Sequence, residues 1–354
     1  MKIVLFSDLH AHPFKNGTID EHGRNSRVSD AIGVIKQVYS YAKKIDASCV
    51  LFGGDLFDRR KSIDVDTFNR VHDVIDTCSS EIHTLMIPGN HDQANKSGTI
   101  HALERFSGSS CHVFSEPCWY EMGAQTYVFG VPYYDDGRKI SRAVEEGLVN
   151  VPGDASNRIL LIHYGVNGAK VGPGDYVLPS ELSVGMLFPE EWNIIFSGHY
   201  HIGQQIGAKF HYIGSAMQHR WDDAGLQKSF VVYDTETGKM ERIPTEAPVF
   251  KVVTRATELK EPAFVRYVLS KRKSEKELDK IKDTLFKRGA ISVEFRENLP
   301  DTSPEEYLRV ELSFDEGYES VLEKYIDYVD IKNKSGIKKS NILKVGKELL
   351  RGLF

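Results

Sequence analysis

Seven side chains of kinds that bind metal ions follow apolar runs in the first two thirds of the chain. They are Asp8 and His10 in IVLFSDLH, Asp55 in CVLFGGD, Asn90 in TLMIPGN, His163 in ILLIH, and His199 and His201 in IIFSGHYH. Each apolar run predicts a buried strand, and open α/β sheets bind ligands at the carboxyl ends of their strands. We therefore expect the seven side chains to converge on one site.

The ligand types predict which ions this site would bind. Two carboxylates, one amide oxygen and four imidazoles, with no thiolate, suit Mn²⁺ better than a structural zinc or an all-oxygen calcium site. Mg²⁺ is a second candidate. Asp55 has two carboxylate oxygens and could bridge two ions about 3.5–4 Å apart. Such a pair activates water and holds a phosphate for in-line attack, so the sequence predicts two-metal hydrolysis of a phosphoester.

His91 directly follows Asn90, and we expect it to reach the phosphate rather than a metal, as an acid or a charge stabiliser. Asp92 either orients that imidazole or caps a turn, and both readings stay open. Taken singly, these signals are weak, because a lone D-x-H pattern is more often a turn with a surface histidine. The ordered series, with GNHD after an apolar strand, is far more specific.

The hydrophobic pattern predicts an α/β fold, a two-sheet sandwich flanked by helices. Helical periodicity covers residues 27–44 and 64–78, with a further helix near 100–106. Strands are expected at residues 2–6, 48–54, 82–89, 111–115, 126–134, 158–165, 193–198 and 210–215, with a hairpin over 229–244. From about residue 112 onward the pattern becomes strand-rich, which favours two sheets packed face to face.

Three domains are expected: a catalytic domain (1–245), a small α+β capping domain (246–315) and a helix-loop-helix (316–354). A Pro-, Glu- and Lys-rich stretch over residues 244–262 marks the first boundary. In the capping domain we expect strands at 263–270, 290–295 and 307–314. A helix should run over 274–289, with Ser274 as N-cap and Glu277 closing a capping box.

Composition is ordinary for a soluble enzyme, with 41% hydrophobic and 27% charged residues. The net charge of −5 argues against nucleic-acid binding by bulk attraction, so any basic surface must be local. Four cysteines without a C-x-x-C pair suggest idle thiols in a reducing compartment. No apolar run reaches membrane-spanning length, and we expect a cytoplasmic protein that does not bind membranes.

The ordered motifs resemble the calcineurin-type metallophosphoesterase superfamily. Residues 53–71 (GGDLFDRRKSIDVDTFNRV) and 87–92 (IPGNHD) are similar to the nuclease subunit of the SbcCD-type (Mre/Rad) DNA repair complex. Bacteriophage recombination nucleases of this kind are the nearest resemblance, which would place the protein in the host cytoplasm. The resemblance covers residues 1–240 strongly, and the rest only in order and character.

The resemblance implies how the residues divide between two ions and the substrate. One ion would be bound by Asp8, His10, Asp55 and His201, the other by Asp55, Asn90, His163 and His199, with His91 as the catalytic histidine. Asp58 stands where many relatives have histidine, so no catalytic role is carried over to it. After Gly214 and Ser215 many relatives continue with proline, whereas here Gln218, His219, Arg220 and Trp221 either face DNA or form an ordinary surface loop.

The implied activity is that of a Mn²⁺-dependent DNA exonuclease and single-strand endonuclease. It would act with an SMC-like ABC-type ATPase in DNA repair, recombination or phage DNA processing. A small-molecule phosphodiesterase or protein phosphatase of the same superfamily is the alternative enzyme. A metal-free scaffold on a phosphoesterase fold is the alternative from another class.

Two segments are candidates for protein contacts. Residues 331–354 contain seven Lys or Arg residues against the single acid Glu348, beside an apolar stripe that includes Ile342, Val345 and Leu349. This tail either docks on its own small domain or binds the base of an ATPase coiled coil, as the resemblance implies. Phe68, Val71 and Ile75 lie at helical spacing and either form a homodimer contact or cover their own sheet.

Overall fold

The computed structural model describes residues 1–95, 97–108, 110–172, 176–177, 179–297, 343 and 345–346. The chain divides into two compact units, Met1–Glu297 and Asn298–Phe354, and the architecture below is that of the first. The strand predicted at 307–314 lies outside the described residues. Of the two predicted terminal helices, only residues 343, 345 and 346 are described, and they are helical.

The first sheet has six strands and contains the start of the chain. Their order is β12 (Met240–Pro244), β11 (Ser229–Asp234), β1 (Lys2–Phe6), β2 (Cys49–Phe52), β3 (Thr84–Met86) and β4 (Cys111–Val113). Strands β1 to β4 are parallel, so their carboxyl ends meet at one edge, and β11 joins antiparallel to β1. The predicted hairpin over 229–244 is confirmed as β11 and β12.

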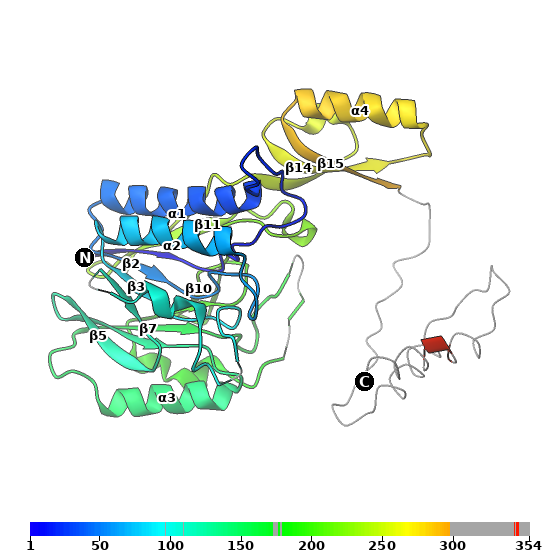
Figure 1. The fold of residues 1–354 in the computed structure, drawn as a ribbon. Coiled ribbons are helices and arrows are strands. Elements are labelled where there is room, and N and C mark those ends of the chain that lie inside the picture. The colour runs from blue at the N-terminus through cyan, green and yellow to red at the C-terminus, as the bar shows by residue number, and fades with distance from the viewer. Residues whose placement is uncertain are drawn as a thin grey trace. The chain divides into compact units, whose positions relative to one another are not determined.

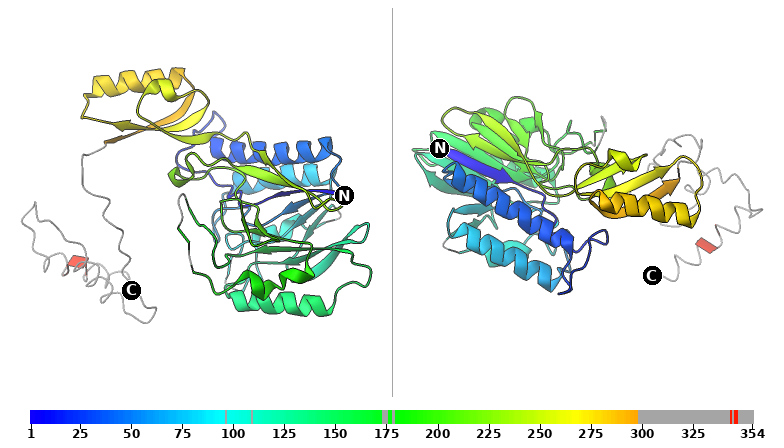
Figure 2. Two further views of the ribbon diagram at one scale, coloured as in Figure 1. Left: turned by 180° about the vertical axis from the view of Figure 1, so that it is seen from behind. Right: turned by 90° about the horizontal axis from the view of Figure 1, so that it is seen from above.

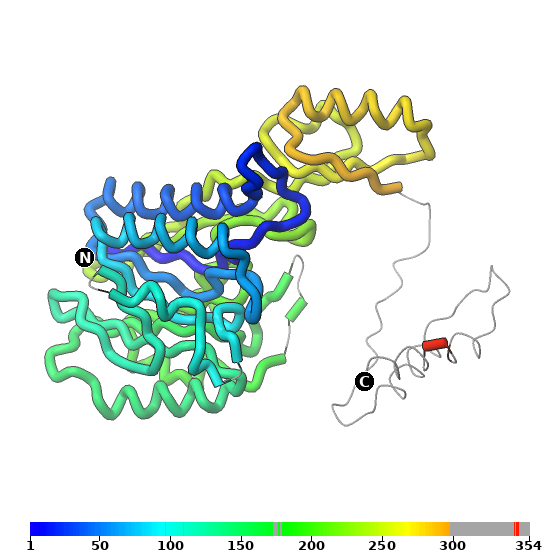
Figure 3. The backbone as a smooth tube through the Cα atoms, in the orientation of Figure 1, coloured from blue at the N-terminus to red at the C-terminus, as the bar shows by residue number. Residues whose placement is uncertain are grey.

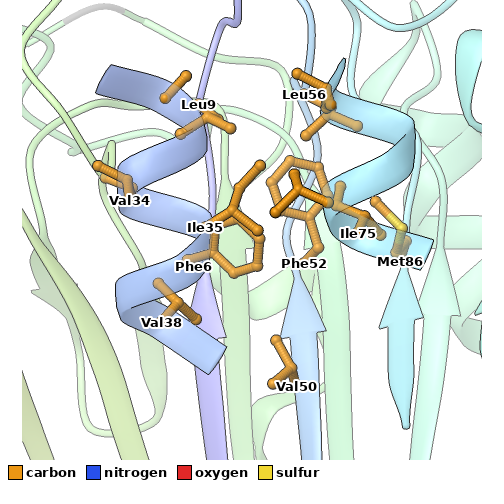
Figure 4. Close-up of a cluster of buried hydrophobic side chains, with 14 of the residues drawn as sticks. Phe6, Leu9, Val34, Ile35, Val38, Val50, Phe52, Leu56, Ile75 and Met86 are labelled. Atoms are coloured by element: carbon orange, nitrogen blue, oxygen red, sulfur yellow. The ribbon is translucent and has the colours of Figure 1, made fainter. Parts of the chain in front are cut away.

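Two helices cover the outer face of this sheet, α1 (Ser26–Lys44) and α2 (Val65–Ser79). They lie side by side in the views of Figure 1 and Figure 2. Asn25 and Asp64 cap their first turns by accepting hydrogen bonds from backbone N–H groups. Figure 4 shows Ile35 of α1 and Ile75 of α2 packed over Phe6 and Phe52 of the sheet.

The second sheet also has six strands and packs face to face with the first. Their order is β5 (Cys118–Gly123), β6 (Thr126–Val131), β7 (Asn157–His163), β8 (Ile194–Gly198), β10 (Phe210–Tyr212) and β9 (Gln204–Ile206). Buried residues from both sheets, such as Leu5 and Leu51 with Leu161 and Phe196, form one cluster between them. The predicted two-sheet sandwich is therefore confirmed.

Helix α3 (Gly137–Val149) covers the outer face of the second sheet, and it was not predicted. Strands β5 and β9 were also missed. The helix predicted near 100–106 is a short 3₁₀ helix. The five 3₁₀ helices of the described residues are η1 (Ala102–Phe106), η2 (Val184–Leu187), η3 (Pro189–Glu191), η4 (Trp221–Asp223) and η5 (Ala256–Glu258).

A third, parallel sheet follows, formed by β13 (Val249–Val253), β14 (Ala263–Leu269) and β15 (Ala290–Glu297). Helix α4 (Glu275–Lys287) lies between β14 and β15 in the chain, and Figure 3 traces this segment in yellow and orange. The predicted capping box at its start is present, with Ser274 and Glu277 hydrogen-bonded to each other. The unpredicted β13 lies inside the stretch that was interpreted as a boundary.

Among the described residues, no helix is both long enough and apolar enough to span a lipid bilayer.

Candidate metal centre

The seven predicted ligands lie together where strands of both sheets end. Those after β1, β2 and β3 come from the first sheet, and those at the ends of β7 and β8 come from the second. Three triads bring their ligand atoms within 4.8 Å of one another. These triads are Asp8–His10–His201, His10–Asp55–His91 and Asp8–Asp55–His163. The carboxyl ends of parallel strands in the two packed sheets thus bring the predicted residues to one place.

The first predicted ligand group lies around His10. Its Nε2 atom is 3.1 Å from Nε2 of His201 and 3.6 Å from Oδ2 of Asp55. Asp8 is fully buried beside them and belongs to the same triad as His10 and His201. Two imidazole nitrogens this close can both coordinate the same cation.

The second predicted ligand group lies around Asn90. Its Oδ1 atom is 3.2 Å from Nε2 of His163 and 3.0 Å from Nδ1 of His199. Oδ2 of Asp55 lies 3.3 Å from the same His163 nitrogen. Asp55 is thus within reach of both groups through one oxygen atom, the position that a bridging carboxylate requires.

The donor set fits two divalent ions. Asp8, Asp55 and His163 are almost completely buried, and isolated charges in such a place are costly unless they pair or bind a metal. Borderline ions such as Mn²⁺ and Zn²⁺ accept the mixture of oxygen and imidazole ligands. The fold therefore presents a site for divalent metals.

Four of the ligand residues have unusual backbone conformations. The φ angles of Asp8, His10, Asp55 and His199 are 51°, 45°, 60° and 89°, in the left-handed region. Such a conformation costs a non-glycine residue on the order of 1 kcal/mol or more, so the surroundings must enforce it. Backbone hydrogen bonds do so here, including Asp8 N–H to the carbonyl of Gly54 at 2.9 Å and His10 N–H to that of Asp55 at 3.0 Å.

Two glycines of the motifs are required by close approach. A Cβ atom on Gly54, whose φ is 96°, would lie 2.4 Å from Nδ1 of His163. A Cβ atom on Gly89 would lie 2.2 Å from Oδ1 of Asp55. Any larger residue at either position would displace a predicted ligand.

Asp92 holds together the two loops that carry Asp55 and Asn90. Its carboxylate accepts hydrogen bonds of 2.8–3.2 Å from the backbone N–H groups of Asp55, Leu56, Phe57 and Gly89. Of the two roles left open, this geometry fits the capping of a turn. The His91 imidazole instead contacts Asp58, whose carbonyl oxygen lies 2.5 Å from its Nδ1 atom.

His163 is oriented and charged by its neighbours. Its Nδ1 atom donates to the carbonyl of Gly53 at 2.7 Å, which turns Nε2 toward Asp55. Burial lowers the pKa of His163, but the facing carboxylate of Asp55 outweighs this effect and raises the pKa to about 9. In contrast, burial lowers the pKa of His199 to about 3, so its imidazole is neutral.

His219 belongs to the site, although the sequence suggested only a surface or DNA-facing residue. It is buried, donates from Nε2 to the carbonyl of Asp8 at 3.0 Å, and its ring lies 5.1 Å from that of His10 and 5.4 Å from that of His201. Gln218 is also buried, with its side chain bonded to the backbones of Leu226 and Phe250. The surface-loop interpretation is wrong for these two buried residues, and contact with DNA stays a prediction. Arg220 is exposed and Trp221 half-buried.

The face of α2 that could form a homodimer contact is mostly buried within the protein itself. Val71 is completely buried and Ile75 is 1% exposed, both in the core between α2 and the first sheet. Phe68 is partly buried and stacks on Phe57 with ring centroids 5.6 Å apart. This face therefore packs on its own sheet, which was the alternative to a homodimer contact.

Comparisons with known proteins identify the family of this chain. The family model described as Calcineurin-like phosphoesterase matches residues 1–203, which hold all seven predicted ligands. The protein named "Putative phosphoesterase 078R" of Invertebrate iridescent virus 3 is 26% identical over 192 residues, 52% of each chain. The present chain therefore spans about half the length of this curated relative.

Two solved structures are similar at low sequence identity. A dimetal phosphatase from Danio rerio is 10% identical, with a TM-score of 0.45 over 69% of this chain and 95% of that one. An archaeal phosphodiesterase is 11% identical, with a TM-score of 0.34 over 69% of this chain and 100% of that one. The match of the family model over more than half of the sequence, with the ligand motifs inside it, shows that the chain belongs to the Calcineurin-like phosphoesterase family.

Proposed function

We propose that this protein is a two-metal, Mn²⁺-dependent phosphodiesterase that cleaves DNA as an exonuclease and a single-strand endonuclease. It would act with an SMC-like ATPase in DNA repair, recombination or phage DNA processing. One observation carries the two-metal part: Oδ2 of Asp55 lies 3.6 Å from Nε2 of His10 and 3.3 Å from Nε2 of His163, between two groups of ligands.

The residues of the chain divide the work of hydrolysis. When bound, divalent ions supply positive charge that polarises a phosphoester and makes water a better nucleophile. Asp8, Asp55 and Asn90, with His10, His163, His199 and His201, would hold them. His91 is half-buried at the edge of the site, with its Nδ1 atom committed to the carbonyl of Asp58. Its Nε2 atom is the one left for the substrate, and it donates a hydrogen bond or a proton when the ring carries a proton on both nitrogens.

The choice of DNA rests on the resemblance of residues 53–71 and 87–92 to SbcCD-type nucleases. An additional α+β segment, β13 to β15 with α4, is consistent with a nuclease that carries more than a minimal phosphatase fold. A basic C-terminal stretch in a chain of negative net charge favours binding of a partner protein or of a polyanion such as DNA.

The test is cleavage of end-labelled single-stranded and duplex DNA with Mn²⁺, Mg²⁺ or EDTA, alone and with an SMC-like ATPase. We expect Mn²⁺-dependent shortening of single strands, and duplex degradation that ATP stimulates when the ATPase is present. Bis(p-nitrophenyl) phosphate and p-nitrophenyl phosphate report diester and monoester hydrolysis without any need for DNA. Diester hydrolysis with no DNA cleavage would favour a small-molecule phosphodiesterase, and preferred monoester or phosphoprotein hydrolysis would favour a phosphatase.

A metal-free scaffold would bind no ion and hydrolyse neither ester. Titration with Mn²⁺ followed by metal analysis of the gel-filtered protein separates it from an enzyme. Asp222→Asn is a matched control, since Asp222 is an exposed carboxylate that lines the same cavity of about 380 Å³ as His10 and Asp55. This variant should keep the metal content of the native chain, whereas Asp55→Asn should not.

A further inference from the structure

A second cavity, of about 580 Å³, lies beside the metal centre, with aromatic and basic side chains on its walls. Its aromatic residues are Phe14, Trp221 and Phe250. Its basic residues are Lys15, Arg59 and Arg220, which are all exposed. The residues come from the loop after β1, the loop after β2, the 3₁₀ helix η4 with the residues before it, and β13.

This cavity adjoins the metal centre through shared residues. Arg220 lines both this cavity and the one that contains His10, Asp55 and His91. Two further wall residues contact the ligand His10: Asp58, with Oδ1 3.6 Å from Nδ1 of His10, and His219, with its ring 5.1 Å away. A ligand in the second cavity would therefore lie next to whatever occupies the metal centre.

The aromatic walls are fixed in place by packing. The Trp221 indole lies under the guanidinium carbon of Arg266, 4.2 Å from the ring centroid, and meets the Phe250 ring edge-on at 4.9 Å. Phe14 lies against the His12 ring at 5.0 Å and the His219 ring at 6.2 Å. Trp221 and Phe14 are only half-buried, so each keeps ring surface available to a ligand. A preorganised ring loses little conformational entropy when a planar ligand stacks on it.

The charges around the cavity favour a ligand that is anionic as well as aromatic. Three exposed cations face a single carboxylate, Asp58, in a chain whose net charge is −5. An apolar ligand would gain nothing from these cations, and a simple anion would gain nothing from the aromatic rings. Stacking platforms interleaved with basic residues are the usual means of binding a single polynucleotide strand.

We propose that this cavity binds one unpaired nucleobase of a polynucleotide strand whose adjacent phosphodiester lies at the metal centre. Trp221 and Phe14 stack on the base, and Arg59 and Arg220 contact the flanking phosphates. The proposal rests on the proposed function and adds a position-specific demand: the enzyme needs a base at one fixed distance from the bond it cleaves. A duplex would have to open locally to satisfy that demand.

The test combines base deletion in the substrate with substitution in the protein. Single-stranded oligonucleotides with one abasic site at successive positions are cleaved with Mn²⁺, and kcat/KM is measured for each position. We expect a loss on the order of 10-fold at one position relative to the cleaved bond, because stacking contributes that much per base. In Trp221→Ala the intact oligonucleotide should lose as much, and the abasic site should then have no further effect.

Several controls keep the outcome interpretable. Trp221→Phe should restore part of the loss, and Phe286→Ala, which removes an exposed ring from α4, should behave like the native chain. Phe14→Leu serves as a second variant if Trp221→Ala fails to fold, since Trp221 packs on Phe250. Hydrolysis of bis(p-nitrophenyl) phosphate should stay within about twofold of native for the Phe286→Ala control.

The outcomes separate this inference from the proposed function. If DNA is cleaved but no abasic position matters, or if the loss persists undiminished in Trp221→Ala, the nucleobase cavity is refuted and the nuclease stands. If bis(p-nitrophenyl) phosphate is hydrolysed but DNA is not, both proposals fall together. Loss of kcat with bis(p-nitrophenyl) phosphate in Trp221→Ala would mean that the indole supports the metal centre rather than a base.

Discussion

The Nδ1 atom of His91 lies 2.5 Å from the backbone carbonyl oxygen of Asp58. Because a carbonyl can only accept, Nδ1 must carry a proton, which leaves Nε2 as the nitrogen that faces the substrate. The partner is a main-chain atom, so the contact does not depend on the side chain at position 58. An aspartate at position 58 therefore leaves the orientation of His91 intact.

We expect His91→Ala to bind two metal ions and yet lose most of its activity. The seven predicted ligands remain, whereas the group that donates to the substrate is gone, at a cost on the order of 10²-fold in kcat. Metal content of the gel-filtered protein and hydrolysis of bis(p-nitrophenyl) phosphate measure the two effects separately. Loss of an ion together with the activity would instead make His91 a ligand.

Asp55→Ala should abolish the paired site. Its Oδ2 atom is the carboxylate oxygen close to both His10 and His163, so one alanine removes a ligand from both groups at once. We expect less than one tightly bound Mn²⁺ per chain and no measurable diester hydrolysis. Asp222→Ala, which removes an exposed carboxylate of the same cavity outside the predicted ligand set, is the matched control. Two ions retained by Asp55→Ala would refute the bridging role.

Metal binding should release a proton and strengthen as the pH rises toward about 9. Before metal binds, the carboxylate of Asp55 raises the pKa of His163 to about 9, so at pH 7.5 the imidazole is protonated and must lose its proton to become a ligand. Calorimetry with Mn²⁺ in buffers of different ionisation enthalpy should show about one proton released. His199, with a pKa of about 3, should contribute none. A heat that does not vary with the buffer would contradict this assignment.

The same group gives a pH dependence of stability in the metal-free chain. The pKa of His163 is higher in the folded protein than its ordinary value of 6.5. Its stabilising contribution is therefore complete below about pH 6.5 and is lost as the pH rises through about 9. Melting temperatures measured in EDTA should fall over this range, and His163→Gln should flatten that part of the profile. An unchanged slope in the variant would assign the effect to another group.

Deletion of residues 331–354 should leave Mn²⁺-dependent cleavage of single strands intact and abolish binding to the ATPase. The seven predicted ligands all lie before residue 202, whereas the proposed docking stripe includes Val345, which is 54% exposed. Pull-down affinity and ATP-stimulated duplex degradation measure the loss. Leu349→Asp should mimic the deletion, and Lys344→Gln should not if the contact is apolar. Unchanged affinity of the truncated chain would make the tail an ordinary packing element.

The sequence predicted the parts of the site that depend on strand ends. Asp55 and His163 each follow or close a buried apolar run, β2 in the first sheet and β7 in the second. Parallel strands align such positions within each sheet, and the packing of the two sheets brings the two sets together. His219 could not be found in this way, because its role depends on a contact with Asp8 from 211 residues away. In the sequence, His219 follows a short strand and a Gly-Ser turn. This pattern predicts a surface loop as readily as a buried residue at the site.

Helix α3 was missed for a different reason. Gly147 interrupts its apolar face, and a helix that contains glycine gives a weak periodic signal. The structure supplies the explanation, because a Cβ atom at Gly147 would lie 2.3 Å from the ring of Phe129 on β6. The residue that lowers the intrinsic helix propensity is the one that lets the helix approach the sheet.

The left-handed backbone at Asp8, His10, Asp55 and His199 lowers the stability of the folded protein in order to position its metal ligands. The hydrogen bonds that enforce these conformations come from the chain itself, so the folded protein carries the strain whether or not an ion is present. Glycine at any of the four positions would relieve about 1 kcal/mol of backbone strain, but it would also remove a metal ligand. A variant such as His10→Gly can therefore melt at a higher temperature than the native apoprotein and still be inactive. Selection for thermal stability alone would therefore favour substitutions that remove metal ligands.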